Sequence, residues 1–179
     1  GNGLLLPRDI NWVAANVDAR VEEVIYKPGM KVSKGQLLVR MSNPTLEQKL
    51  QENRLELDAR RAETDATNAE LQNKILSQEA LVLDAKSRLL SSTMRLAAQK
   101  KYIAAVPMLE YETTRINTEQ YRQQVVLEEK RLKTLKLSID ADIKASAMRL
   151  NKLESLVLLS QQEVDSLNVT SPIEGILQD

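Results

Sequence analysis

A stretch of 124 residues without glycine constrains this chain more than any other feature. All five glycines lie outside residues 44–167, and within that range the only proline after the first residue is Pro107. Because glycine and proline are the residues that most often end a helix, this stretch predicts two long helices that meet near Pro107. At about sixty residues each and a rise of about 1.5 Å per residue, each helix would be on the order of 90 Å long. Helices of that length must cover their apolar faces against each other or against neighbouring molecules.

The composition also argues against an ordinary compact core. Phe is absent, aromatic residues make up 3% of the chain, and 28% of its residues are charged. A compact core normally buries several large rings, because these side chains carry much of the burial energy. The middle of the chain is rich instead in Leu, Ala, Glu, Gln, Lys and Arg, a mixture typical of long helices and coiled coils.

Charge and residue types exclude several classes of function. Lys plus Arg and Asp plus Glu number 25 each, and the chain has neither His nor Cys. A protein that binds nucleic acid needs an excess of basic residues on some face, and no stretch supplies one. Without imidazole or thiol groups the chain lacks the common nucleophiles, general bases and zinc ligands. We therefore expect no enzymatic activity, no cofactor, no metal and no nucleic-acid partner.

Two sets of charged residues could be taken for functional sites. Neighbouring acids occur as Glu22-Glu23, Glu128-Glu129 and Asp140 with Asp142. Residues one or two apart on a helix do not face each other, so we interpret these acids as solvated surface. Lys31 and Lys34 are also expected at the surface.

No window of about 18 uninterrupted apolar residues occurs, so no membrane-spanning helix is expected. The sequence also does not open with a charged segment followed by an apolar one, as a signal peptide does. We expect any signal or anchor to lie outside these 179 residues.

Apolar residues recur every seven positions on both predicted helices, the spacing that holds a coiled-coil seam together. The first helix has a cap-like start at Asn43-Pro44, with Glu47 in its first turn. One stripe on it comprises Ile75, Val82, Leu89, Leu96 and Ile103. A second stripe comprises Leu55, Ala62, Ala69, Leu76, Leu83, Leu90 and Ala97. One seam suffices for a hairpin, so the second stripe is our candidate for contact between copies.

The second helix carries two registers of the same kind. One comprises Val125, Leu132, Ile139 and Leu153, interrupted at Ser146; the other comprises Ile143, Leu150, Val157 and Val164. Both registers favour packing against the first helix in an antiparallel hairpin.

The two ends of the chain have the character of short strands and turns. Val21 and the run after Val24 are β-prone and end at Pro28-Gly29, and residues 36–41 follow a second break at Gly35. Residues 168–179 return to the same chemistry but are too few to fold alone. We therefore predict three segments, 1–43, 44–167 and 168–179, in which both ends form one β-module and Val21 and Val24 lie near Ile173 and Ile176.

The predicted turn between the helices, near residues 104–108, is unusually apolar. The residues concerned are Tyr102, Ile103, Val106, Met108 and Leu109. They could close the end of the hairpin core, or they could form a docking surface, since exposed apolar clusters usually mark contacts. Both interpretations stay open at this point.

Two segments carry a resemblance to a known family. Val21-Glu-Glu-Val24 with Lys27-Pro-Gly-Met-Lys-Val-Ser-Lys-Gly-Gln-Leu-Leu38 resembles the first half of a lipoyl or biotinyl carrier domain, and Thr170-Ser-Pro-Ile-Glu-Gly-Ile176 resembles the start of the second half. Here a coiled coil stands where carriers have the turn with the modified lysine. The arrangement resembles periplasmic adaptor (membrane fusion) proteins of the haemolysin-secretion-D and drug-efflux superfamily. The resemblance implies an α+β fold, mostly α, with a long antiparallel two-helix coiled-coil hairpin inserted into a split lipoyl-like β-domain.

The resemblance also implies a function. Proteins of this family bridge an inner-membrane transporter to a TolC-like outer-membrane channel through a ring of copies whose hairpins form a tube. The implied location is the periplasm, with the full-length protein anchored to the inner membrane and with further domains beyond Asp179. In the family's tip motif, Arg-x3-Leu-x6-Ser, only Arg95 matches, because Gln99 and Val106 stand at the other two positions. Arg95 therefore joins the apolar turn residues as a candidate partner contact. The alternatives are a carrier-like subunit of an enzyme complex and a cytoplasmic coiled-coil scaffold.

Overall fold

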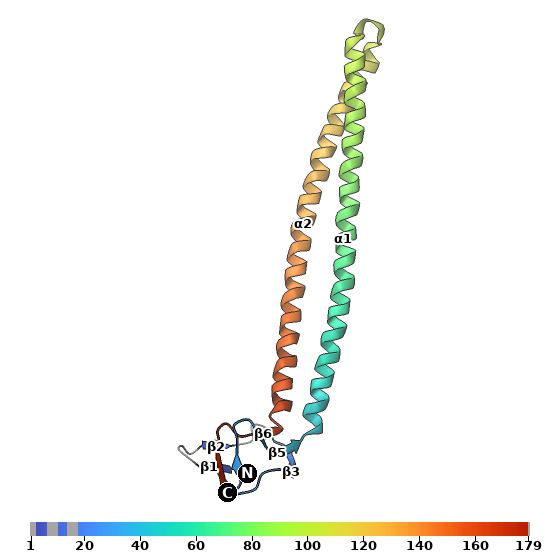
Figure 1. Cartoon of the computed structure of the whole chain (residues 1–179). Coiled ribbons are helices and arrows are strands. Elements are labelled where there is room, and N and C mark those ends of the chain that lie inside the picture. Colours follow the sequence, from blue (N-terminus) through green and yellow to red (C-terminus); the bar gives the residue numbers. More distant parts are fainter. Residues whose placement is uncertain (1–2, 7–10, 14–17, 179) are drawn as a thin grey trace. The chain divides into compact units, whose positions relative to one another are not determined.

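The computed structural model describes residues 3–6, 11–13 and 18–178, so parts of the predicted segments 1–43 and 168–179 lie outside the described residues. The elements, in chain order, are β1 (Gly3–Leu6), β2 (Asn11–Val13), β3 (Arg20–Val24), β4 (Lys31–Val32), β5 (Leu37–Ser42), α1 (Pro44–Lys101), the short 3₁₀ helix η1 (Ile103–Ala105), α2 (Met108–Asp165), β6 (Asn168–Thr170) and β7 (Gly175–Gln178) (Figure 1). The chain divides into two compact units, Gly1–Arg61 with Arg149–Asp179, and Ala62–Met148. Each is described by itself.

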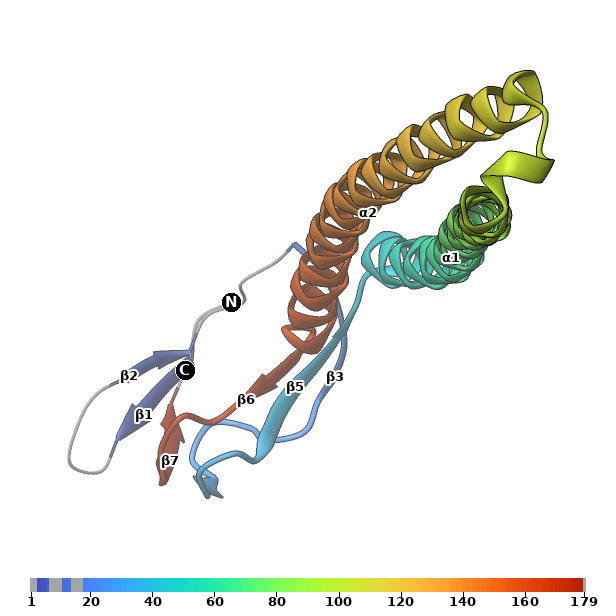
Figure 2. The same ribbon diagram turned by 90° about the horizontal axis from the view of Figure 1, so that it is seen from above.

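The first unit contains two small antiparallel sheets, with strand orders β2-β1-β7-β4 and β3-β5-β6 (Figure 2). Strands from opposite ends of the sequence are neighbours in both: β7 pairs with β1 and β4, and β6 pairs with β5. The two 58-residue helices, about two-thirds of the chain, are thus inserted between strands that pair with each other. This confirms the predicted fold class, a helical hairpin inserted into a β-module.

The core of this β-module joins the two ends of the chain. Val32, Leu38 and Leu177 are buried together. Ser171, 2% exposed, links the segments through its backbone, because its N–H donates to Gln36 O at 2.9 Å and its carbonyl accepts from Gly35 N at 2.7 Å. Neither end could bury this core alone, which is the physical reason for the pairing.

The structure places Val21 and Val24 in a different sheet from Ile176, and their closeness to Ile173, which packs against the core of the module, stays a prediction. Val21 and Val24 lie on β3, pair with Met41 and Val39 of β5, and are about half exposed. Ile176 lies in the other sheet, where it pairs with Leu6 and Lys31. The apolar pattern marked these residues as strand residues, but it does not say which strands lie side by side.

Two glycines make the turns that the sequence predicted. Gly29 and Gly35 have φ values of 87° and 84°, a region that residues with a Cβ rarely adopt. Helix α1 also begins as predicted at Pro44. The Asn43 side-chain oxygen accepts from the N–H groups of Thr45 at 3.1 Å and Leu46 at 3.3 Å, which satisfies two of the free amides at the helix start.

In the second unit α1 and α2 lie antiparallel and side by side (Figures 1 and 2). The inward-facing side chains alternate at spacings of three and four, as in a coiled coil. On α1 between residues 71 and 99 they are Leu71, Ile75, Gln78, Val82, Ala85, Leu89, Ser92, Leu96 and Gln99. On α2 between residues 111 and 139 they are Tyr111, Thr114, Thr118, Tyr121, Val125, Glu128, Leu132, Leu135 and Ile139.

This seam confirms the first predicted stripe with one exception. Ile103 lies beyond the end of α1, in η1, and is 44% exposed. The heptad spacing continues past the residue where the helix ends, so the pattern alone could not exclude Ile103 from the seam. Both registers of α2 turn inward as predicted, whereas the second stripe of α1, from Leu55 to Ala97, is exposed throughout.

The interpretation of Glu128 as solvated surface is wrong. Glu128 is 4% exposed and occupies a seam position. Its carboxylate accepts from Gln78 Nε2 at 2.6 Å, Gln124 Nε2 at 3.0 Å and Arg131 Nη1 at 2.9 Å. Burial is tolerated because three donors replace the lost water. The adjacent Glu129 is on the flank of the seam and pairs with Lys86 at 3.2 Å, with both side chains about half exposed.

We predict that Gln78→Leu destabilises the hairpin by about 1–3 kcal/mol, because it removes a donor from the buried Glu128 carboxylate. Adding Glu128→Leu should recover that loss, since the pair is then apolar and in contact. Chemical unfolding followed by circular dichroism measures both. Glu129→Gln is the control and should change stability by less than about 1 kcal/mol. A double variant no more stable than Gln78→Leu would contradict the assignment.

Candidate functional site

The tip of the hairpin is a tight connection within the second unit. Helix α1 ends at Lys101, η1 spans Ile103–Ala105, and α2 begins at Met108 directly after Pro107. Pro107 cannot donate a hydrogen bond, and its fixed φ suits the start of a helix. Backbone bonds close the turn, from Ala105 N to Tyr102 O at 2.9 Å and from Val106 N to Ile103 O at 3.3 Å.

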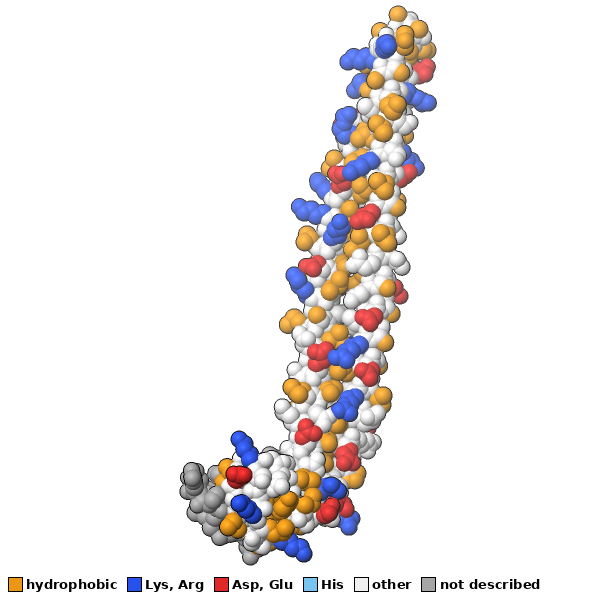
Figure 3. All heavy atoms as spheres, in the orientation of Figure 1, with side chains coloured by type: hydrophobic (Ala, Val, Ile, Leu, Met, Phe, Trp, Pro, Cys, Tyr) orange, Lys and Arg blue, Asp and Glu red, His pale blue; other side chains and the backbone are white. Residues whose placement is uncertain are grey.

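The apolar residues of the tip face solvent. Leu109 is 80% exposed, Met108 68%, Tyr102 63% and Ile103 44%, and only Val106 is partly buried. Hydrophobic side chains gather at this end in Figure 3. In the single chain, therefore, Leu109, Met108, Tyr102 and Ile103 do not close the hairpin core. A contiguous apolar cluster on a solvent-facing turn is the usual mark of a contact surface; contact with a partner stays a prediction.

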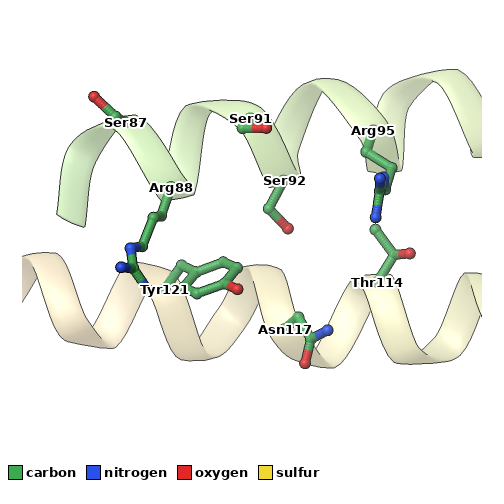
Figure 4. Close-up of a pocket in the computed structure, with 8 residues that line it drawn as sticks. All are labelled: Ser87, Arg88, Ser91, Ser92, Arg95, Thr114, Asn117 and Tyr121. Carbon is green, nitrogen blue, oxygen red and sulfur yellow. The ribbon is translucent and has the colours of Figure 1, made fainter. Parts of the chain in front are cut away.

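Cationic groups border this cluster. The Lys101 ammonium lies 5.6 Å from the centre of the Tyr102 ring, within the range of a cation–π contact. Arg95, six residues before Lys101 on α1, is exposed and makes no ion pair with any residue that the structure describes. Its guanidinium points from α1 toward Thr114 of α2 (Figure 4).

A polar groove of about 350 Å³ runs between the helices below the tip. It is lined by Ser87, Arg88, Ser91, Ser92, Arg95, Thr114, Asn117 and Tyr121. Arg88 reaches across to lie beside Tyr121 in Figure 4 and pairs with Asp84 at 3.0 Å. Between the two helices the Ser92 and Thr118 hydroxyls are hydrogen-bonded to each other at 2.5 Å. These two polar side chains therefore have partners within the hairpin.

Gln99 is the functional candidate that the sequence did not single out. It is 9% exposed, and its Nε2 donates to Glu110 Oε1 at 3.3 Å. Its Oε1 is buried and has no hydrogen-bond partner among the described residues. The sequence noted Gln99 only as a departure from a motif, although its spacing from Ser92 and Leu96 already placed it in the seam.

Arg95 and Gln99 border one hollow of about 420 Å³, together with Pro107, Leu109 and Glu110. Arg95 is exposed and offers its guanidinium donors to this hollow, whereas the Gln99 side-chain oxygen is buried and lies out of reach of a docking partner. The hollow therefore combines one exposed cation with the exposed apolar side chain of Leu109.

Nothing among residues 3–6, 11–13 and 18–178 brings together three or more His, Cys, Asp or Glu side chains that could hold a metal ion. Within the same residues, no helix has the length and hydrophobicity needed to cross a bilayer.

Searches against protein-family models and curated proteins find no match to this chain. Solved structures do align with it. The periplasmic adaptor protein EmrA shares 12% identity, with 97% of this chain and 67% of EmrA covered and a TM-score of 0.49. LipC, a membrane fusion protein of a type I secretion system, shares 10% identity, with 92% and 89% covered and a TM-score of 0.45. The membrane fusion protein Spr0693 from Streptococcus pneumoniae R6 shares 16% identity, with 99% and 53% covered and a TM-score of 0.36.

We predict that Gln99→Leu raises the stability of the hairpin by about 1–3 kcal/mol, the opposite of Gln78→Leu, because it removes an unpaired buried oxygen instead of a paired donor. Glu110 loses a bond but is exposed and returns to water. Chemical unfolding of Gln99→Leu and Gln78→Leu under identical conditions shows whether each substitution raises or lowers the free energy of unfolding. A loss of stability at Gln99 would mean that its oxygen is satisfied in solution.

Proposed function

We propose that this chain is part of a periplasmic adaptor protein of an efflux or secretion system. Residues 1–43 and 168–179 would belong to one lipoyl-like β-domain, and residues 44–167 to the hairpin inserted into it. Support comes from the paired strands at the two ends of the chain and from the helices between them. The protein would work in the periplasm, with the full-length form anchored to the inner membrane.

The role is mechanical and not catalytic. The chain would bridge an inner-membrane transporter and an outer-membrane channel of the TolC kind, with several copies in a ring whose hairpins form a conduit. No bond is made or broken, in keeping with a sequence that has neither His nor Cys.

The observation that carries the proposal is the exposed apolar tip beside Arg95 and Gln99. Burying one such side chain against a partner is worth roughly 1.5–3 kcal/mol. Met108 and Leu109 are the most exposed of the tip residues, so they lose the most water-accessible surface on docking. Repeated around a ring, a modest contact per copy becomes a stable junction. The proposed partner-contact residues are Arg95, Tyr102, Ile103, Val106, Met108 and Leu109.

We predict that Met108→Ser with Leu109→Ser, introduced into the full-length protein in its host, abolishes export or efflux. Helix content and thermal stability should stay close to those of the parent, because both side chains are 68% or more exposed. The matched control is Leu158→Ser with Leu159→Ser, an adjacent pair on α2 that is 60% and 51% exposed and outside the tip. The control should export normally.

Two outcomes would contradict this assignment. If the tip variant unfolds, the two residues are core. If it folds and export continues, the contact surface is elsewhere on the protein.

A further inference from the structure

The polar groove between α1 and α2 below the tip is lined by hydrogen-bond donors and by no carboxylate. Two of its eight lining residues are the arginines Arg88 and Arg95, and the other six are Ser, Thr, Asn and Tyr. Every one of these side chains carries an N–H or O–H group. In a chain with equal numbers of acidic and basic residues, a hollow whose only lining charges are two cations is electrostatically distinct.

The surrounding acids leave one of these two cations unpaired. Asp84 pairs with Arg88 at 3.0 Å, whereas Arg95 has neither an ion pair nor a hydrogen bond among the described residues. Glu110 borders the adjacent hollow, where it accepts a hydrogen bond from Gln99. The other charged residues of α2 at this level are paired with each other and do not line the groove: Glu112 with Arg115, and Glu119 with Arg122. The groove therefore has one uncompensated positive charge.

The facing wall, on α2, adds two polar groups without partners. The Asn117 amide and the Tyr121 hydroxyl make no hydrogen bond with any residue that the structure describes. In Figure 4 Asn117 lies between the Tyr121 ring and the Arg95 guanidinium along the groove. Hydrogen-bonding groups from both helices thus line one hollow of about 350 Å³.

We propose that this groove binds a small polar organic acid, whose carboxylate or phosphate group lies on Arg95 and whose remaining polar atoms reach Asn117 and the Tyr121 hydroxyl. The planar guanidinium fork matches both kinds of group through paired, charge-assisted hydrogen bonds. The volume lies at the lower end of the range for small-ligand sites, about 300–1,000 Å³, so it suits a solute of a few carbon atoms. This binding activity goes beyond the proposed function and does not rest on it.

The groove selects its ligand by charge, and the ligand would link the two helices. A cationic solute would be repelled by Arg95, and a neutral one would leave the guanidinium without a counter-charge. Because the groove is open to solvent, we expect weak binding, with a dissociation constant on the order of 1 mM. A bound acid would bridge Arg95 on α1 and Asn117 on α2, and a ligand that binds only the folded state raises its stability.

Nuclear magnetic resonance titration of the full chain tests the site with two probes, citrate and inorganic phosphate, against sodium chloride at equal ionic strength. Saturable shifts of the Asn117 side-chain amide and the Arg95 Nε–H signals are expected with at least one probe and not with chloride. Asn117→Ala and Tyr121→Phe should each raise the dissociation constant several-fold with helix content unchanged. Both variants leave every proposed tip contact in place.

Arg115→Gln is the matched control, because Arg115 pairs with Glu112 at 2.9 Å and does not line the groove. It should bind the probe as the parent does, whereas Arg95→Gln should lose saturable binding. Shifts that grow linearly, or that chloride reproduces, would mean that the groove only attracts ions and would overturn the proposal. Equal affinity in the parent, Asn117→Ala and Tyr121→Phe would overturn the assigned residues. The measurement needs no transport, so its outcome is separate from that of the proposed function.

Discussion

The seam between α1 and α2 is the interaction on which the rest of the structure depends. Either helix alone would be marginally stable in water, because helix formation is cooperative and most helical stability in proteins comes from packing. The polar residues of the seam help to fix the register of that packing. Asn53 bonds Ser160 at 2.7 Å in the first unit, and Gln78 bonds Glu128 at 2.6 Å in the second. A slip of one heptad would place Gln78 opposite Tyr121 or Leu135 and Asn53 opposite Leu153 or Leu167, so these pairs favour a single register.

Because the seam uses only one strip of each helix, the remaining surface is free to serve other contacts. The hairpin presents an exposed apolar tip, and the outward side of each helix exposes large apolar side chains, such as Leu83 and Leu90 on α1 and Leu137 and Met148 on α2. Conventional sites for small molecules are shallow here, and the hollows near Arg95 are open. An exposed apolar cluster of this kind is the usual mark of a protein contact surface and not of a small-molecule site.

The sequence predicted the features that follow from a repeated residue pattern, and it did not predict those that depend on one specific contact. Helix extent, the Asn43 cap and the inward stripe follow from short-range rules, so they were visible in the pattern. Glu128 was not, because its burial depends on Gln78, which lies fifty residues away in the sequence. The exposure of Ile103 depends on where the helix ends, and the neighbours of Val21 depend on which strands pair. Gln99 could have been found from its seam position, but its unpaired oxygen required coordinates.

The unpaired oxygen of Gln99 links occupancy of the tip to its rigidity. An unsatisfied buried acceptor costs the free hairpin about 1–3 kcal/mol, a penalty concentrated in its last turns. Opening of these turns lets water reach the oxygen and removes the penalty, whereas a partner that packs on the exposed tip side chains binds only the closed form and stabilises it. The end of the hairpin should thus fray most readily before assembly and least readily after it. Hydrogen exchange of the backbone amides at the tip would then report the binding of a partner there directly, without a measurement of transport.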